Sequence, residues 1–172
     1  MSLDLKPITD GFGAYASGIN LSSKLSRETI AAIEAGMDKY SVLVWRDSLL
    51  EDDHQIRLAE NFGKIEISLL SKVRGKGGPA NKSLVPISNV GDDGELLDYD
   101  GRRLGSQIAN QFWHSDSSFA KSVAKYSILS ARKIPKKGGD TEFADLRAAY
   151  DELPDDLKMI VEGLIAEHHV FH

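Results

Sequence analysis

Two runs of β-forming residues joined by a glycine-rich turn most constrain the fold of this 172-residue chain. The run VAKYSILSARKIP, residues 123–135, favours a strand because β-branched and aromatic residues recur along it. The glycine-rich stretch KKGGDTEFAD then predicts a turn that leads into another strand. The last third of the chain therefore predicts part of a β-sheet.

The first part of the chain predicts alternating strands and helices. A strand or bend is expected in FGAYASGINLSS. A helix is expected in SRETIAAIEAGMDKY, where Ser26 is a suitable N-cap and Glu28 favours the first turn. The β-branched run SVLVW predicts a buried strand, and HQIRLAENFG predicts a second helix that Gly63 ends.

The middle and the end of the chain predict a loop, a short strand and two further helices. Residues 71–83 are rich in Gly, Lys and Ser and indicate a long loop, and VPISNV indicates a short strand. The helices are expected in DLRAAYDEL and in PDDLKMIVEGLIAEH, where Pro154 suits a first turn. An apolar stripe on the last helix predicts a face packed in the core, formed by Leu157, Ile160, Val161, Leu164 and Ile165.

Composition limits the partners and the kinds of site. A net charge of −5 argues against nucleic acid as a general partner. Because the chain has no cysteine, any metal must be held by His, Asp or Glu. No apolar run is long enough to span a membrane, and the first residues do not resemble a signal peptide, so a cytoplasmic location is expected. The sequence leaves open whether the chain forms a homo-oligomer.

The segment FWHSDSSF, residues 112–119, carries the clearest chemical signal. On a strand, positions i and i+2 face the same side, so His114 and Asp116 would project together and could share one divalent ion. Trp113 and Phe119 are expected to shield that ion from bulk water. The alternative is a chance tripeptide, because His-x-Asp occurs often. A Ser/His/Asp hydrolase is disfavoured, since adjacent members on one strand cannot form a relay.

Three longer segments extend this signal: ANQFWHSDSSF, AKYSILSARKIP and GGDTEFADLRAAYDELP. Together they closely resemble the family of taurine dioxygenase and 2,4-dichlorophenoxyacetate dioxygenase, and within it the 2,4-dichlorophenoxyacetate branch. The resemblance runs from SGINL to AEHH, which is essentially the whole chain. It implies an Fe(II)- and 2-oxoglutarate-dependent oxygenase. The implied fold is mainly β, a double-stranded β-helix (jelly roll) with flanking helices, of which residues 1–172 form the N-terminal portion of a single domain.

The resemblance also implies roles for particular residues. His114 and Asp116 match the family's first two iron ligands, and no catalytic residue beyond the metal ligands is implied. Thr141 matches the threonine that binds a carboxylate of 2-oxoglutarate, with two glycines just before it that allow a tight turn. Asn110 matches a residue that lines the substrate pocket in the taurine-oxidising members, and Lys72 lies near the position where the family presents a polar or basic group to the substrate's acid.

Two further groups of the family's site lie outside residues 1–172. They are the third iron ligand, a histidine far downstream, and the arginine that binds the other carboxylate of 2-oxoglutarate. His168, His169 and His172 are candidates for a substitute ligand. Substitution is disfavoured because this stretch is expected to leave a helix and enter a strand, and because it lacks the glutamate of a zincin motif.

The leading interpretation is an enzyme that uses Fe(II), 2-oxoglutarate and O2 to hydroxylate a small anionic substrate, with release of succinate and CO2. The branch suggests an aryloxyalkanoate, although relatives oxidise sulfonates and sulfate esters. The alternative is a non-catalytic or partner-dependent jelly-roll fragment with an incomplete iron site. In either case, residues 1–172 by themselves are expected to be inactive.

Overall fold

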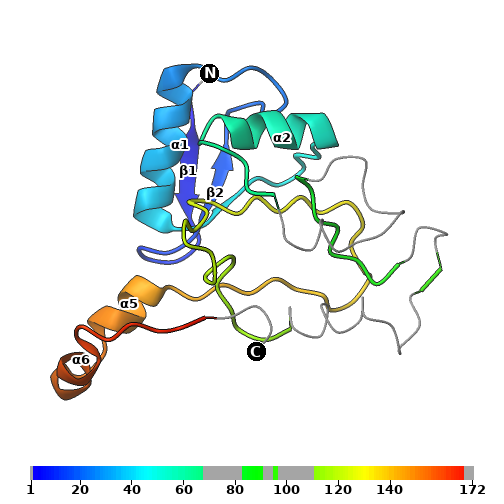
Figure 1. Cartoon of the computed structure of the whole chain (residues 1–172). Coiled ribbons are helices and arrows are strands. Elements are labelled where there is room, and N and C mark those ends of the chain that lie inside the picture. Colours follow the sequence, from blue (N-terminus) through cyan, green and yellow to red (C-terminus); the bar gives the residue numbers. More distant parts are fainter. Residues whose placement is uncertain (1, 68–82, 91–94, 97–110, 169–172) are drawn as a thin grey trace.

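The computed structural model describes residues 2–67, 83–90, 95–96 and 111–168, which contain one small sheet and four helices (Figure 1). Strands β1 (Asp4–Pro7), β2 (Ala14–Ser17) and β3 (Leu43–Val44) lie in that order in the sheet. β1 and β2 are antiparallel, whereas β2 and β3 are parallel and are linked by helix α1 (Arg27–Tyr40). None of the helices in these ranges is long and apolar enough to cross a membrane.

Helix α1 begins and ends where its sequence supplies caps. The Oγ of Ser26 accepts a hydrogen bond from the backbone N–H of Thr29 at 3.2 Å, and Glu28 lies in the first turn. At the other end, Ser41 has a φ of 62° and its N–H donates to the carbonyl of Met37 at 2.8 Å. The predicted N-cap and first turn are therefore confirmed.

Replacing Ser26 with alanine is expected to loosen the start of α1. Loss of an N-cap hydroxyl costs about 1 kcal/mol, which corresponds to amide exchange that is about fivefold faster in the first turns. Hydrogen exchange followed by mass spectrometry measures this effect. Ser22→Ala is the matched control, because the Ser22 side chain makes no hydrogen bond within the described residues. Equal exchange in the two variants would contradict the capping role.

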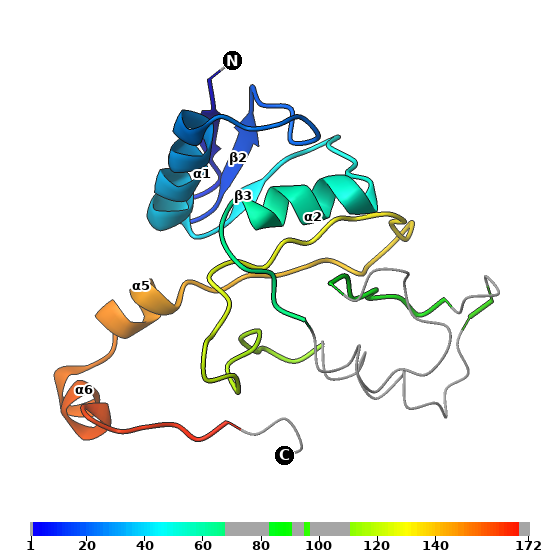
Figure 2. The same ribbon diagram turned by 45° about the horizontal axis from the view of Figure 1, so that its top comes forward.

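The N-terminal unit, residues 2–67, has its own core between the helices and the sheet. Helix α2 (Asp52–Glu60) lies beside α1 and the sheet (Figure 2). Gly36 lets α1 approach the sheet closely, because a Cβ there would lie 2.9 Å from Leu5 Cδ1 and 3.2 Å from Leu43 Cδ1. The buried apolar cluster consists of Leu21, Ile33, Leu50 and Leu58.

The predicted strand–helix order of this unit is confirmed, with differences at its edges. β1 was not predicted, although it pairs with β2 along four residues. The run SVLVW contributes only Leu43–Val44 to the sheet. Helix α2 ends at Glu60, and Asn61 caps it by donating from Nδ2 to the carbonyl of Arg57 at 2.8 Å, while Gly63 follows with a φ of 143°. Asn61, rather than Gly63, therefore ends the helix.

The prediction of a strand at residues 123–135 is wrong for the described structure. The chain is extended there (Figures 1 and 2), but residues 121–144 make no backbone–backbone hydrogen bond with other described residues. The physical reason is that no described strand lies alongside to accept and donate. The predicted strand VPISNV likewise contributes only an isolated bridge between Val90 and Leu96. The described residues therefore form a small sheet with helices and not a jelly roll.

The two last helices are shorter than the sequence predicts. They are α5 (Leu146–Asp151) and α6 (Asp155–Val161), and α6 lies away from the sheet and α2 in both views (Figures 1 and 2). Pro154 is the N-cap of α6, just before its first turn. The predicted core face is wrong here, because all five of its residues are exposed, from 42% at Leu157 to 94% at Ile165. The described residues therefore leave this stripe uncovered.

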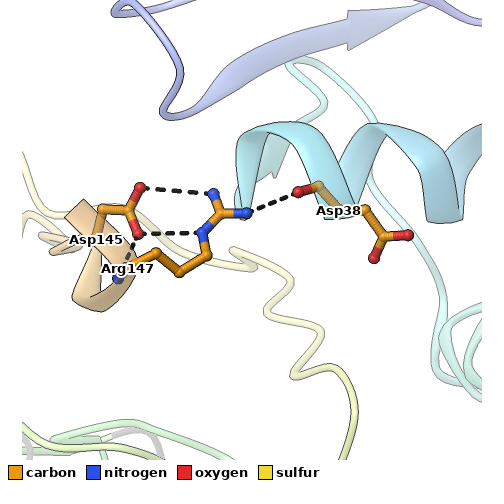
Figure 3. A network of polar contacts seen from close by, with 3 residues as sticks. All are labelled: Asp38, Asp145 and Arg147. Carbon is orange, nitrogen blue, oxygen red and sulfur yellow. Dashed lines mark hydrogen bonds and ion pairs between the residues drawn. The ribbon is translucent and has the colours of Figure 1, made fainter. Parts of the chain in front are cut away.

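Helix α5 is attached to the end of α1 by one arginine (Figure 3). Asp145 caps α5 by accepting from the N–H of Arg147 at 2.9 Å, and hydrogen bonds from Arg147 lower the pKa of Asp145. Arg147 Nη1 also donates to the carbonyl of Asp38 at 2.7 Å. That carbonyl belongs to the last turn of α1, where a cation is favoured. The chain after residue 144 is thus tied to the N-terminal unit.

Candidate metal centre

His114 and Asp116 lie in an irregular segment that runs into a turn, so the prediction that they stand on a strand is wrong. The turn begins at Asp116, and the N–H of Ala120 donates to the carbonyl of Ser117 at 2.8 Å. Their side chains nevertheless meet, with His114 Nε2 3.5 Å from Asp116 Oδ1. The two side chains are 47% and 60% exposed, so a small ion could reach both.

The distance between these two atoms suits a shared metal ion. Two ligand atoms about 2.1 Å from one ion, at right angles to each other, lie about 3.0 Å apart. The observed 3.5 Å needs only a small closing movement of the side chains. An exposed His–Asp ion pair would give a similar distance, but such pairs contribute little to stability. The distance alone is therefore compatible with a metal site and with an ordinary ion pair. The surroundings of the two side chains distinguish these interpretations.

The hydrogen bond of the His114 ring is arranged so that Nε2 could bind a metal ion. Its Nδ1 lies 2.7 Å from the carbonyl oxygen of Phe112. A carbonyl can only accept, so Nδ1 carries the hydrogen and Nε2 keeps its lone pair in the neutral ring. Nε2 is the nitrogen that faces Asp116. Metal-binding histidines usually have their second nitrogen occupied in this way.

Two serine hydroxyls fix the turn around Asp116. Ser127 Oγ donates to Asp116 Oδ2 at 2.7 Å, and Ser117 Oγ donates to Glu66 Oε1 at 2.9 Å. Ser117 has a φ of 54°, a left-handed conformation that is uncommon for a residue other than glycine. Sequence analysis missed Ser127 and Glu66, because each is distant in sequence from its partner and no local spacing signals the contact.

Of the other three predicted site residues, the structure describes only Thr141. Thr141 is exposed in an irregular segment, and among the described residues no hydrogen bond joins it to His114 or Asp116. Gly138 and Gly139 have φ values of 71° and 76°, which confirms the expected glycine-dependent turn before Thr141. The predicted substrate-binding residues, Asn110 and Lys72, lie outside the described residues.

A third metal ligand is not found in the part of the chain that the structure describes. No group of three His, Asp or Glu side chains there could hold an ion, so His168 does not complete the site. His169 and His172 lie outside the described residues. The prediction that Trp113 and Phe119 shield the site is wrong for the described structure, because the side chains of His114 and Asp116 are 47% and 60% exposed and the two aromatic residues are themselves 69% and 40% exposed. No described apolar element covers these rings.

Comparison with known protein families identifies the family of this chain. Residues 4–172 match the family described as "Taurine catabolism dioxygenase TauD, TfdA family". The chain therefore belongs to the TauD/TfdA family of dioxygenases, which confirms the resemblance noted in the sequence.

Within this family, the chain is similar to 2,4-dichlorophenoxyacetate dioxygenases. The chain is 41% identical over 172 residues to the alpha-ketoglutarate-dependent 2,4-dichlorophenoxyacetate dioxygenase of Burkholderia sp. (strain RASC). It is 43% identical over 172 residues to the enzyme of that name from Cupriavidus pinatubonensis. A crystal structure of AAD-2 in complex with Mn(II) and N-oxalylglycine shares 38% identity and a TM-score of 0.82.

The chain covers only part of each relative. The two sequence matches include 100% of this chain but 58% and 60% of the relatives. The structural match includes 94% of this chain and 54% of AAD-2. The chain therefore spans less than two thirds of the length of the relatives that it matches.

Proposed function

We propose that the whole protein represented by this chain is an Fe(II)- and 2-oxoglutarate-dependent dioxygenase that hydroxylates a small anionic substrate, most closely an aryloxyalkanoate. The observation that carries the proposal is the approach of His114 Nε2 to Asp116 Oδ1, at 3.5 Å, in a chain of the TauD/TfdA family. The Mn(II) and N-oxalylglycine in the AAD-2 structure support a divalent metal beside a ligand that resembles 2-oxoglutarate.

In the proposed reaction, residues of this chain would hold the metal ion and 2-oxoglutarate. When bound, iron and 2-oxoglutarate together activate O2 and supply the oxidising power, with release of succinate and CO2. His114 would offer its Nε2, and the carboxylate of Asp116 would offset part of the ion's charge. Together with the third ligand from further polypeptide, His114 and Asp116 would hold the ion on one side and leave positions for the co-substrates. Thr141 donates a hydrogen bond to a carboxylate of 2-oxoglutarate.

The substrate would be held by residues from other parts of the chain. Asn110 lines its pocket, and the cationic side chain of Lys72 pairs with its acid group. Both assignments rest on the motif resemblance. Among the anionic substrates of relatives, an aryloxyalkanoate is favoured by the identity of 41–43% to two 2,4-dichlorophenoxyacetate dioxygenases.

For the whole protein we assign a jelly-roll fold, with residues 1–172 as the N-terminal portion of a single domain. Two observations support this assignment: residues 121–144 are extended without backbone partners among the described residues, and the apolar stripe in and just after α6 is exposed. A further polypeptide would supply the partner strands, the third iron ligand and the arginine for 2-oxoglutarate. The same observations favour the second candidate for the 172-residue chain alone, a fragment that depends on a partner.

A chimera tests the proposed activity. In it, residues 1–172 replace the matching part of the Cupriavidus pinatubonensis relative, which supplies the rest of its own length. With Fe(II), ascorbate and 2-oxoglutarate, we expect succinate release that depends on 2,4-dichlorophenoxyacetate. Release only with a sulfonate or a sulfate ester would contradict the aryloxyalkanoate assignment. A folded, iron-loaded chimera that releases succinate with none of these substrates would contradict the proposed function.

Replacing Thr141 with valine in the chimera is expected to weaken binding of 2-oxoglutarate about tenfold or more. A hydrogen bond to a charged group contributes about 1.5–3 kcal/mol, and valine lacks the hydroxyl that donates it. Titration of 2-oxoglutarate into the iron-loaded, anaerobic protein measures the affinity. Thr141→Ser keeps the hydroxyl and is expected to retain binding. An affinity that is unchanged in the valine variant would remove Thr141 from the site.

A further inference from the structure

The segment that carries Ser127 is fixed to the N-terminal unit by three polar contacts and by one ring contact, in which Tyr126 meets the edge of Phe62 with ring centroids 5.4 Å apart. Lys125 Nζ lies 2.6 Å from Glu34 Oε1 of α1, and Arg132 Nη2 lies 2.9 Å from Asp52 Oδ1 of α2. Between them, Gln55 Nε2 of α2 donates to the carbonyl of Ile128 at 2.9 Å. Because residues 121–144 make no backbone–backbone hydrogen bond with other described residues, these side-chain contacts set the course of the segment.

The contact between Gln55 and Ile128 holds the residue next to Ser127. Ile128 packs against the buried core cluster of the N-terminal unit, in addition to accepting the hydrogen bond from Gln55. Residue 128 is thus held through both its side chain and its backbone. Ser127 is consequently presented from a fixed point, although its own side chain is at the surface.

The Ser127 hydroxyl contacts one of the two oxygens of Asp116. It donates to Oδ2 at 2.7 Å, while Oδ1 remains 3.5 Å from His114 Nε2. A carboxylate that gives one oxygen to a hydrogen bond has the other left for an ion. Hydrogen bonds of this kind orient metal-binding carboxylates in many metal sites.

We propose that Ser127 is a positioning residue that presents Asp116 to the metal through Oδ1 alone, and that Gln55 of α2 holds Ser127 in place through Ile128. The proposal rests on the proposed function in one respect, that Asp116 binds the ion. Its consequence is that the carboxylate occupies one position of the ion instead of two. A further position then stays open for 2-oxoglutarate and O2.

The test measures Mn(II) binding to the complete 172-residue chain. The electron paramagnetic resonance signal of free Mn(II) reports the bound fraction, whatever the association state of the protein. Ser127→Ala is expected to weaken binding about tenfold, the lower end of the effect of losing a ligand's hydrogen-bond partner. Ser127→Thr retains the hydroxyl and is expected to bind like the parent. Ser122→Ala, an exposed serine with no described hydrogen bond, is the matched control.

A double substitution tests the role of Gln55. Gln55→Glu has nearly the same shape and keeps an acceptor for Arg132, but it cannot donate to the carbonyl of Ile128. We expect it to weaken Mn(II) binding when Ser127 is present and to add nothing when Ser127 is alanine. Residues that act through one another show such non-additive effects. Additive effects would overturn the part assigned to Gln55.

Two outcomes separate this inference from the proposed function. If Asp116→Ala binds Mn(II) like the parent, the proposed metal site itself fails. If Asp116→Ala loses binding while Ser127→Ala does not, only the positioning role fails. Hydrogen exchange across residues 123–135 supplies a readout that is independent of metal. Faster exchange there in Ser127→Ala, with threonine failing to restore binding, would show a merely structural role and overturn the proposal.

Discussion

An Asp116→Ala variant of the chimera is expected to lose substrate-dependent succinate release and to bind Mn(II) more than about 100-fold more weakly than the parent, beyond the effect of losing a hydrogen-bond partner. The substitution removes the only carboxylate that faces His114 Nε2 in the described structure. A neutral imidazole alone would leave the charge of the dication without a counter-charge at this position. Succinate assay and metal titration on the same preparation measure the two effects.

The control for this variant is Asp10→Ala. Asp10 is an exposed residue of the N-terminal unit, and its side chain makes no described hydrogen bond or ion pair. The Asp10→Ala substitution removes the same charge from the protein and leaves the candidate site untouched. Succinate release and Mn(II) affinity should therefore match those of the parent. Parent-like Mn(II) affinity in Asp116→Ala would show that the His114–Asp116 contact is an ordinary surface ion pair.

The second large effect concerns the 172-residue chain expressed by itself. It is expected to release no succinate and to elute from a sizing column as assemblies larger than a monomer. The reason is its uncovered surface: residues 121–144 make no backbone–backbone hydrogen bond with other described residues, and large apolar side chains such as Phe112, at 68%, and Ile165, at 94%, are exposed. Unpaired edges and large apolar patches promote association between chains.

The chimera is the control for this prediction as well, because it contains the same residues together with a polypeptide of the relatives' remaining length. It should elute as a smaller, defined species and release succinate. A monomeric 172-residue chain that released succinate in a substrate-dependent manner would contradict the prediction. It would also require a third ligand from within the chain, for which His168, His169 and His172 would be examined.

Features of the fold that depend on neighbours in sequence were predictable. The Ser26 cap and helix α2 follow from side chains within a few residues of one another, so the sequence pattern contains the whole interaction. The prediction of a strand at residues 123–135 failed because a strand forms only beside a partner strand, which a local pattern does not contain. The apolar stripe of α6 failed for a similar reason: its pattern indicates a buried face, but burial requires a surface to pack against.

In the candidate site too, contacts between residues close in sequence were predicted, whereas contacts between distant residues were missed. The pairing of His114 with Asp116 was predicted from their spacing, and the structure brings them together, though in a turn and not on a strand. Ser127 and Glu66 were missed because folding, not spacing, brings them to the turn. The role of both proposed ligands stays a prediction until metal binding is measured.

The position of the core cluster within residues 2–67 has a consequence for the order of events during synthesis. Its buried cluster is made only of Leu21, Ile33, Leu50 and Leu58, all of which leave the ribosome well before His114. Early-emerging units commonly fold before later segments are translated. Glu34, Asp52 and Gln55 would then already form a prepared surface when residues 125–132 arrive. The turn that carries His114 and Asp116 would thus form against a folded neighbour, instead of having to find its geometry within an unfolded chain.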